Sequence, residues 1–168
     1  MGAHGYRVGT LAALGNMRDH GVTPDYVASF RAAGYSLPLD QLIGLRDRGV
    51  TPDYVRELGR CGIHNVPADQ LVELRDHGVS PEFVGGAARQ GYRFPTGDLV
   101  RLRDHGVTSD YLGELKALGY AGLSAEEIVR LRSHGVSADF IRRANASGAS
   151  RRSASELVSL RAGGWAER

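Results

Sequence analysis

The stretch LRDHGVTSDYLGELKALGY, residues 102–120, contains one helix end, one helix start and a second helix end. Gly106 suits the position just after a helix, where a positive φ is common, and Thr108 suits the N-cap of the next helix. The apolar residues after this cap have the i, i+1, i+4 spacing of one buried stripe: Tyr111, Leu112 and Leu115. Gly119 then ends the segment. The stretch therefore predicts a helix of about ten residues between two glycine turns.

This arrangement recurs along the chain, which is the signature of a repeat protein. A glycine followed by valine returns every 28 or 29 residues, at Gly21, Gly49, Gly78, Gly106 and Gly135, and Gly164 precedes a tryptophan at the next step. A second series of glycines interleaves with the first: Gly5, Gly34, Gly62, Gly91, Gly119 and Gly148. The two series divide the chain into half-repeats of about fourteen residues, each with its own helix start and stop.

Two kinds of helix are expected to alternate. A helices begin with a pattern such as TPDYV, in which Thr51 is the N-cap and Pro52 the first helical residue. B helices carry a stripe of Leu, Ile and Val, and one of them starts with a capping box made by Ser124 and Glu127. Proline takes the cap position of three B helices, where it starts a helix and does not interrupt one: Pro38, Pro67 and Pro95.

Helices this short are marginal alone in water because nucleation is costly, so each must be held by its neighbours. Two-helix units that bury their stripes against one another form an α-solenoid. We therefore predict an all-α fold: a single α-solenoid domain over residues 1–168, with about eleven short helices in repeats of 28–29 residues. The expected units are 6–34, 35–62, 63–91, 92–119 and 120–148, followed by a half-unit over 149–168.

The composition argues against several classes of protein. Hydrophobic residues make up 42% of the chain, enough for a core, so wholesale disorder is not expected. The net charge is only +2, with acidic and basic residues interleaved, which does not favour nucleic acid or an acidic membrane as the partner. Cys61 is the single cysteine and cannot form an internal disulfide. No membrane span and no secretory signal are visible, so the cytoplasm is the favoured compartment.

The pentapeptide RDHGV occurs three times and could be a metal site, a catalytic device or a turn. Its histidines occur once per repeat, so they are separated by one solenoid step of about 10 Å, whereas zinc needs its ligands within about 2.1 Å of one point. Arg48 replaces histidine in one repeat, and arginine suits a helix C-terminus but does not ligate zinc. The motif is therefore interpreted as a turn, closed by Gly21, Gly49, Gly78, Gly106 and Gly135.

The Asp of this motif lies near a helix C-terminus, where a carboxylate opposes the helix dipole and needs a compensating partner. Each Asp follows an Arg, and the pairs in the middle of the chain are Arg46 and Asp47, Arg75 and Asp76, and Arg103 and Asp104. We predict an Arg–Asp network that runs from repeat to repeat and sets the stacking register. The alternative is that the row of arginines binds an anionic polymer.

Candidate partner-binding residues are those that could face solvent. One aromatic per A helix is expected in the core: Tyr26, Tyr54, Phe83, Tyr111 and Phe140. Another aromatic set follows the closing glycines, is expected to be partly exposed, and supplies better ligand candidates: Tyr35, Tyr92 and Tyr120. Basic residues at positions that vary between repeats are further candidates, although such variation is also typical of a solvated face: Arg101, Arg130, Arg142 and Arg143.

Residues 102–120 resemble tandem repeats of bacterial proteins of unassigned function. Similar arrays are appended to membrane metallopeptidases of the beta-lactam-sensor/antirepressor type. The resemblance covers residues 6–165, but only as repeat units, and the zinc motif and membrane helices of those peptidases are absent from this sequence. It therefore carries over no catalytic residue and implies a bacterial origin with an accessory or interaction role.

No nucleophile–base pair, P-loop, dinucleotide fingerprint or HExxH motif is present, so we expect no enzyme, no cofactor and no metal. The expected function is a scaffold that binds a protein or peptide. One alternative is end-to-end self-assembly into filaments, because apolar Ala12, Ala13 and Leu14 open the array and Trp165 closes it without a polar cap. A second alternative, nucleic-acid binding, is disfavoured by the near-neutral charge.

Overall fold

The structure is a computed structural model that describes residues 11–146 and 150–164. These residues form eleven α-helices and contain no strand: α1 (Leu11–Asp19), α2 (Pro24–Ala32), α3 (Leu39–Asp47), α4 (Pro52–Arg60), α5 (Ala68–Asp76), α6 (Pro81–Arg89), α7 (Thr96–Asp104), α8 (Ser109–Ala117), α9 (Ala125–Ser133), α10 (Ala138–Ala146) and α11 (Ala154–Ala162). Each helix has nine residues, slightly fewer than expected. Tyr6 and Trp165, the expected limits of the array, and Gly5 and Gly148 lie outside the described residues.

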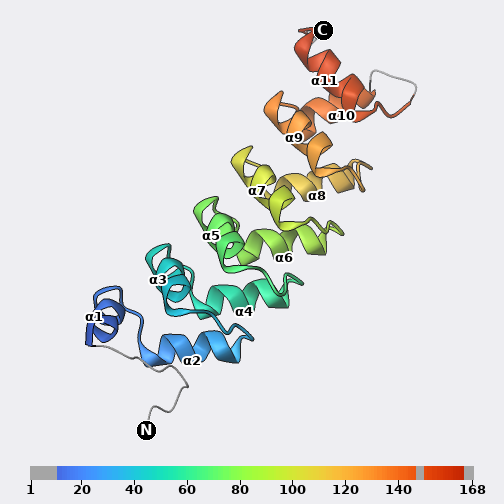
Figure 1. Ribbon diagram of the computed structural model, residues 1–168. Helices are drawn as coiled ribbons and strands as arrows, with labels where there is room; N and C mark the ends of the chain where they lie inside the picture. The colour runs from blue at the N-terminus through green and yellow to red at the C-terminus, as the bar shows by residue number, and fades with distance from the viewer. Residues whose placement is uncertain (1–10, 147–149, 165–168) are drawn as a thin grey trace. The chain divides into compact units, whose positions relative to one another are not determined.

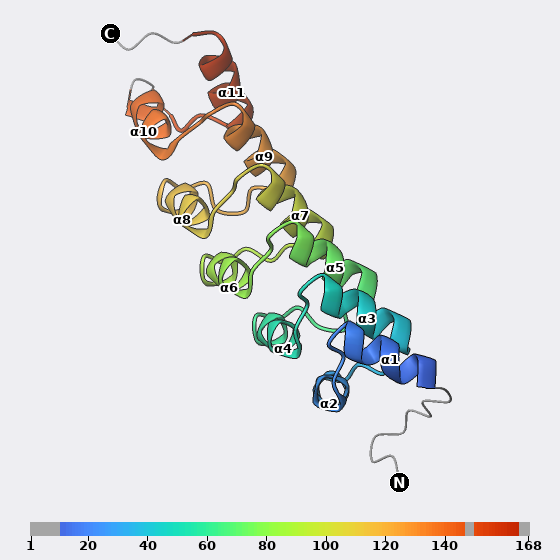
Figure 2. The same cartoon turned by 90° about the vertical axis from the view of Figure 1, so that its left-hand side faces the viewer.

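The chain divides into two compact units, residues 1–81 and 82–168, and each is described by itself. In the first unit, α3 packs against α5 and α2 packs against α4, so the B helices and the A helices form separate layers (Figure 1). In the second unit, α7 packs against α9, α9 against α11, and α8 against α10 (Figure 2). These contacts join a helix to the one two positions further along the chain, which confirms the predicted α-solenoid of two-helix repeats.

The turn after each B helix has a defined geometry. Gly49 has φ 67°, and its amide donates to the carbonyl of Arg46 at 3.1 Å. The amide of Val50 donates to the carbonyl of Leu45 at 2.9 Å, which completes a Schellman motif. The other glycines of this series have φ between 64° and 68°, a region that favours glycine: Gly21, Gly78, Gly106, Gly135 and Gly164. The motif of the pentapeptide is therefore a helix stop, as predicted.

Helix starts also follow the predicted caps. The Thr51 hydroxyl accepts a hydrogen bond from the Tyr54 amide at 3.1 Å, and Thr108 caps α8 in the same way. Ser124 and Glu127 form the expected capping box, and hydrogen bonds from Ser124 lower the pKa of the Glu127 carboxyl. Pro38, Pro67 and Pro95 occupy N-cap positions without a side-chain cap bond. Local signals alone therefore set where most helices begin.

The core lies between the two layers and is made by the predicted stripes. Leu42, Leu45 and Val50 are buried in the first unit, as are Leu102 and Val107 in the second. Three residues of the predicted B stripes are only half-buried: Val72, Val129 and Leu160. No buried side-chain nitrogen or oxygen lacks a hydrogen-bond partner among the described residues. Within the same residues, no helix is long and apolar enough to cross a membrane.

Candidate functional site

The arginines of the motif lie over aromatic rings of the preceding A helix. The Arg46 guanidinium is 5.4 Å from the centre of the Tyr26 ring, which is a cation–π contact. The same contact recurs at 5.2–5.4 Å along the chain: Arg75 over Tyr54, Arg103 over Phe83, Arg132 over Tyr111 and Arg161 over Phe140. These arginines therefore link successive repeats through rings, a contact that the sequence analysis did not predict.

The aspartates have a different partner, namely the residue just before the turn glycine of the preceding repeat. His20 Nδ1 lies 2.9 Å from Asp47 Oδ1, and Arg48 Nη1 lies 2.5 Å from Asp76 Oδ2. Two repeats after Asp76, Ser133 stands at the position of the Asp and hydrogen-bonds His105 Nδ1 at 2.9 Å.

Asp104 occupies the same position of α7 and is exposed. A polar ladder does run between repeats, as predicted, but the partner of Asp47 is His20 and the partner of Asp76 is Arg48, both from the turn of the preceding repeat. Because arginine can replace histidine in a salt bridge, the ladder also explains the RDRGV variant.

Tyrosine hydroxyls of the A helices complete the link between repeats. The Tyr26 hydroxyl donates to the carbonyl of Val50 at 2.8 Å, Tyr54 to Val79 at 2.7 Å, and Tyr111 to Val136 at 2.8 Å. These tyrosines are buried in the core, as expected, and burial raises the pKa of each hydroxyl to about 12.

Phe83 stands at the same position without a hydroxyl, and there the Val107 carbonyl accepts from Arg103 Nη1 at 3.0 Å instead. The carbonyl of the valine after each of these turns thus accepts a hydrogen bond from either the tyrosine hydroxyl or the arginine guanidinium.

The second aromatic set is not exposed in the way predicted. Tyr92 and Tyr120 are buried, with 6% and 4% of their surface exposed, and Tyr35 is half-buried. The Tyr92 hydroxyl donates to the Tyr120 carbonyl at 3.0 Å, and the Tyr120 hydroxyl donates to the Arg152 carbonyl at 2.6 Å. The Tyr35 hydroxyl accepts from the Val66 amide at 3.1 Å. The choice of Tyr92 and Tyr120 as ligand contacts is corrected because both are buried, whereas Tyr35 is partly exposed as predicted. All three hydroxyls join one repeat to the next.

The four candidate arginines are exposed but belong to different layers. Arg101 and Arg130 lie on the B helices α7 and α9, while Arg142 and Arg143 lie on the A helix α10. Arg101 Nη2 lies 3.8 Å from Asp98 Oδ1, and the Arg142 guanidinium forms a salt bridge with the Asp139 carboxylate. Such pairs of exposed side chains contribute little stability, so the guanidinium groups stay accessible. They remain candidates for contact with a partner because all four are exposed.

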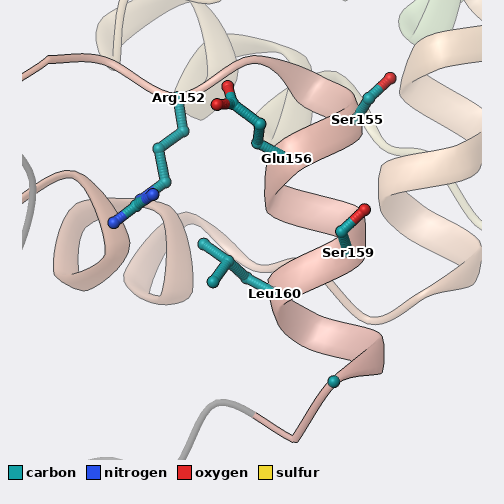
Figure 3. A pocket seen from close by; sticks show the side chains of 6 residues that line it. Arg152, Ser155, Glu156, Ser159 and Leu160 are labelled. Carbon is teal, nitrogen blue, oxygen red and sulfur yellow. The ribbon is translucent and has the colours of Figure 1, made fainter.

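The surface of the described residues includes three depressions that could hold a ligand. One of about 440 Å³, here called the α3–α5 groove, lies between two B helices of the first unit. Another of about 340 Å³ lies between α2 and α4 and is lined by Asp25, Asp53, Arg46 and Arg56. The third, of about 500 Å³, is the α11 depression, whose lining includes Arg152, Glu156 and Leu160 (Figure 3).

The α3–α5 groove was not predicted, although one signal for it is present in the sequence. Its lining includes Leu37, Leu45, Pro67 and Val72, with Gly44 at its base. Other described B helices carry side chains at the position of Gly44: Asn16, Glu73, Arg101, Arg130 and Ser159. A Cβ at Gly44 would meet no atom within 4 Å, so the glycine leaves this space open.

Metal chemistry has no support in this geometry. Within residues 11–146 and 150–164, no group of three or more His, Cys, Asp or Glu side chains could hold a metal ion. His20 and Asp47 do lie together, but their side chains contact each other directly at 2.9 Å. No protein-family model matches the chain, and no curated protein matches it either.

Proposed function

We propose that this chain is a non-enzymatic scaffold that binds a protein or peptide partner through the α3–α5 groove. The observation that carries the proposal is the groove's lining. Leu37, Pro67, Ala68 and Val72 supply apolar surface, which favours the burial of apolar side chains of a partner.

Polar side chains of the groove can fix the orientation of a bound peptide. Gln41 and Asp69 also line it and are exposed, so they can accept hydrogen bonds from a peptide amide or from a basic side chain. An extended or helical peptide that presents apolar residues beside a Lys or Arg has the matching chemistry.

The polar residues of the repeat support a binding role over a catalytic one. His20, Asp47, Arg48 and Asp76 pair across repeats, and the tyrosine hydroxyls bond to backbone carbonyls. These groups are occupied in holding the stack, which leaves the surface between helices for recognition. The resemblance to bacterial accessory repeats is consistent with this role and remains part of the proposal.

The test fills the groove without disturbing the fold. Gly44→Arg places at this position the residue that α7 and α9 already carry there, so we expect a folded protein. Gly97→Arg is the matched control, because a Cβ at Gly97 also meets nothing within 4 Å and this residue lies in α7. The immobilised chain is used to select from a phage-displayed library of random peptides.

Peptides that bind the parent chain and Gly97→Arg but lose at least tenfold in affinity for Gly44→Arg support the proposal. Failure to enrich any peptide, or equal binding to both variants, would contradict it. Selected sequences with apolar residues beside a basic one would support the role given to Asp69.

A further inference from the structure

The α11 depression has the same lining positions as one wall of the α3–α5 groove (Figure 3). The match is clear when positions are counted from the N-caps Pro38 and Ser153. The equivalent pairs are Leu37 and Arg152, Gln41 and Glu156, Gly44 and Ser159, and Leu45 and Leu160. The depression on α11 is therefore half of a B-helix groove.

In α3 the other half is supplied by the next B helix. Pro67, Ala68 and Val72 of α5 close the groove, and Leu45 is only 1% exposed. Leucines at the same position of α5, α7 and α9 are fully buried: Leu74, Leu102 and Leu131. Leu160 is only half-buried at this position, so α11 presents apolar surface that the other B helices cover.

The surface of α1 that would complement α11 is exposed to solvent. Leu14 is 51% exposed and is the one exposed large hydrophobic residue among those described. The residues at its position in the other B helices are at most 2% exposed: Leu42, Leu71, Leu99, Ile128 and Leu157. Gly15 replaces Val72 of the α5 wall, and a Cβ there would meet nothing within 4 Å. Thus α1 presents the side of a B helix that normally faces its predecessor.

We propose that α1 of a second copy of this chain packs on α11, in the register that α5 has on α3. The occupant is a second copy because the two open surfaces are the two halves of one contact, which the chain already makes between α3 and α5, α7 and α9, and α9 and α11. This inference is independent of the peptide groove, which lies on other helices.

Two features make this contact weaker than those within the chain. Gly163 stands where His20 and Arg48 make the polar ladder, so no rung of that ladder can form across the junction. Among the described residues α11 is the last helix, so the described part of the contact is between B helices alone. We expect association only at high concentration. Because the two surfaces differ, the contact is heterologous and can continue beyond a dimer.

The experiment uses sedimentation velocity of the full chain over a range of concentrations. The weight-average mass of the parent chain should rise above 18.1 kDa as the concentration increases. Leu160→Arg and Leu14→Arg each block one surface, and each variant alone should stay monomeric. An equimolar mixture of the two should form dimers and nothing larger, since one intact α11 surface meets one intact α1 surface.

Gly97→Arg is the matched control, because it adds the same charged side chain on α7, outside both α1 and α11, where a Cβ meets nothing within 4 Å, and it should associate like the parent chain. Circular dichroism checks that each variant is folded, and Leu160→Ser replaces Leu160→Arg if the latter unfolds α11. A parent chain that stays at 18.1 kDa at all concentrations would overturn the proposal. Association of either blocked variant alone, or no dimer in the mixture, would overturn it as well.

Discussion

Side chains of one repeat contact the next repeat along the chain. The ring of Tyr54 lies under the Arg75 guanidinium while its hydroxyl donates to the Val79 carbonyl. One repeat later, Phe83 has no hydroxyl and Arg103 donates to the equivalent carbonyl. Either the tyrosine hydroxyl or the arginine guanidinium thus donates a hydrogen bond to this buried backbone carbonyl.

Removing the hydroxyl at Tyr54 tests this shared role. Tyr54→Phe should lower the free energy of unfolding by about 1 kcal/mol, because the Val79 carbonyl loses its donor. Arg75 can then take over as Arg103 does, so Arg75→Leu should cost about 0.5–1 kcal/mol more in the Tyr54→Phe background than in the parent chain. Urea denaturation of the four proteins measures this coupling, and strictly additive losses would contradict it.

The same tyrosines predict how stability depends on pH. Burial raises the pKa of Tyr26, Tyr54 and Tyr111 from 10.0 to about 12, so the unfolded chain loses these protons first as pH rises. Their contribution to the free energy of unfolding is complete below pH 10 and declines between pH 10 and pH 12. Urea unfolding at about pH 9 and pH 11 should show this loss.

Tyr111→Phe provides the comparison for this pH effect. It removes one of the three shifted hydroxyls, so its stability should decline less than that of the parent chain over the same interval. An identical decline in the two proteins would mean that other groups cause the alkaline loss.

At the scale of helices, α6 and α8 approach each other closely at a position where α6 has no side chain. A Cβ added at Gly86 of α6 would lie 2.4 Å from the Cβ of Ser109 at the start of α8, which no relaxed structure tolerates. The glycine pair Gly85–Gly86 therefore has a packing role at its second position. The equivalent residues of other A helices have larger side chains: Ser29, Glu57, Glu114 and Arg143.

Substitution at this helix contact has a predictable sign. Gly86→Ala should lower the free energy of unfolding by about 1–3 kcal/mol, because α6 and α8 must move apart. Gly97→Ala is the control: its Cβ meets nothing and alanine favours a helix, so it should add about 0.5–1 kcal/mol. Thermal unfolding followed by circular dichroism measures both changes. Equal effects of the two substitutions would show that helix propensity, and not the close contact, dominates.

At the scale of the whole molecule, stability comes from nine-residue helices that each depend on their neighbours. None of these helices is long enough to persist alone in water. The observed contacts join helices two positions apart, so the free energy of each unit is approximately a sum of repeat and nearest-neighbour terms.

Deletion of one repeat follows from this additivity. Removal of residues 108–136 takes out α8 and α9 and joins Val107 directly to Ser137, which preserves the HGV-S junction of the repeat. The shortened chain should keep the same helical content per residue and unfold cooperatively at a midpoint roughly several degrees lower. Circular dichroism spectra and melting curves check this. Loss of helical content beyond the deleted residues would contradict nearest-neighbour stacking.

Local signals in the sequence determined the helices and their limits. Glycine after each B helix, Thr or Ser before each A helix, and proline at three caps act within a few residues, so their effect can be read without knowing the fold. The period of 28–29 residues, together with the apolar stripes, also determined that these helices stack as a solenoid. The turn role of Gly49 and the core position of Tyr54 belong to this predictable part.

Only the tertiary structure decided which side chains meet across repeats. Tyr54 reaches Val79 over 25 residues and Arg48 reaches Asp76 over 28, and the partner in each case depends on the rise and rotation between repeats. The sequence determines the helices of each repeat because their signals are local. The polar ladder, the groove at Gly44 and the open surface of α11 depend instead on how one repeat is placed against the next.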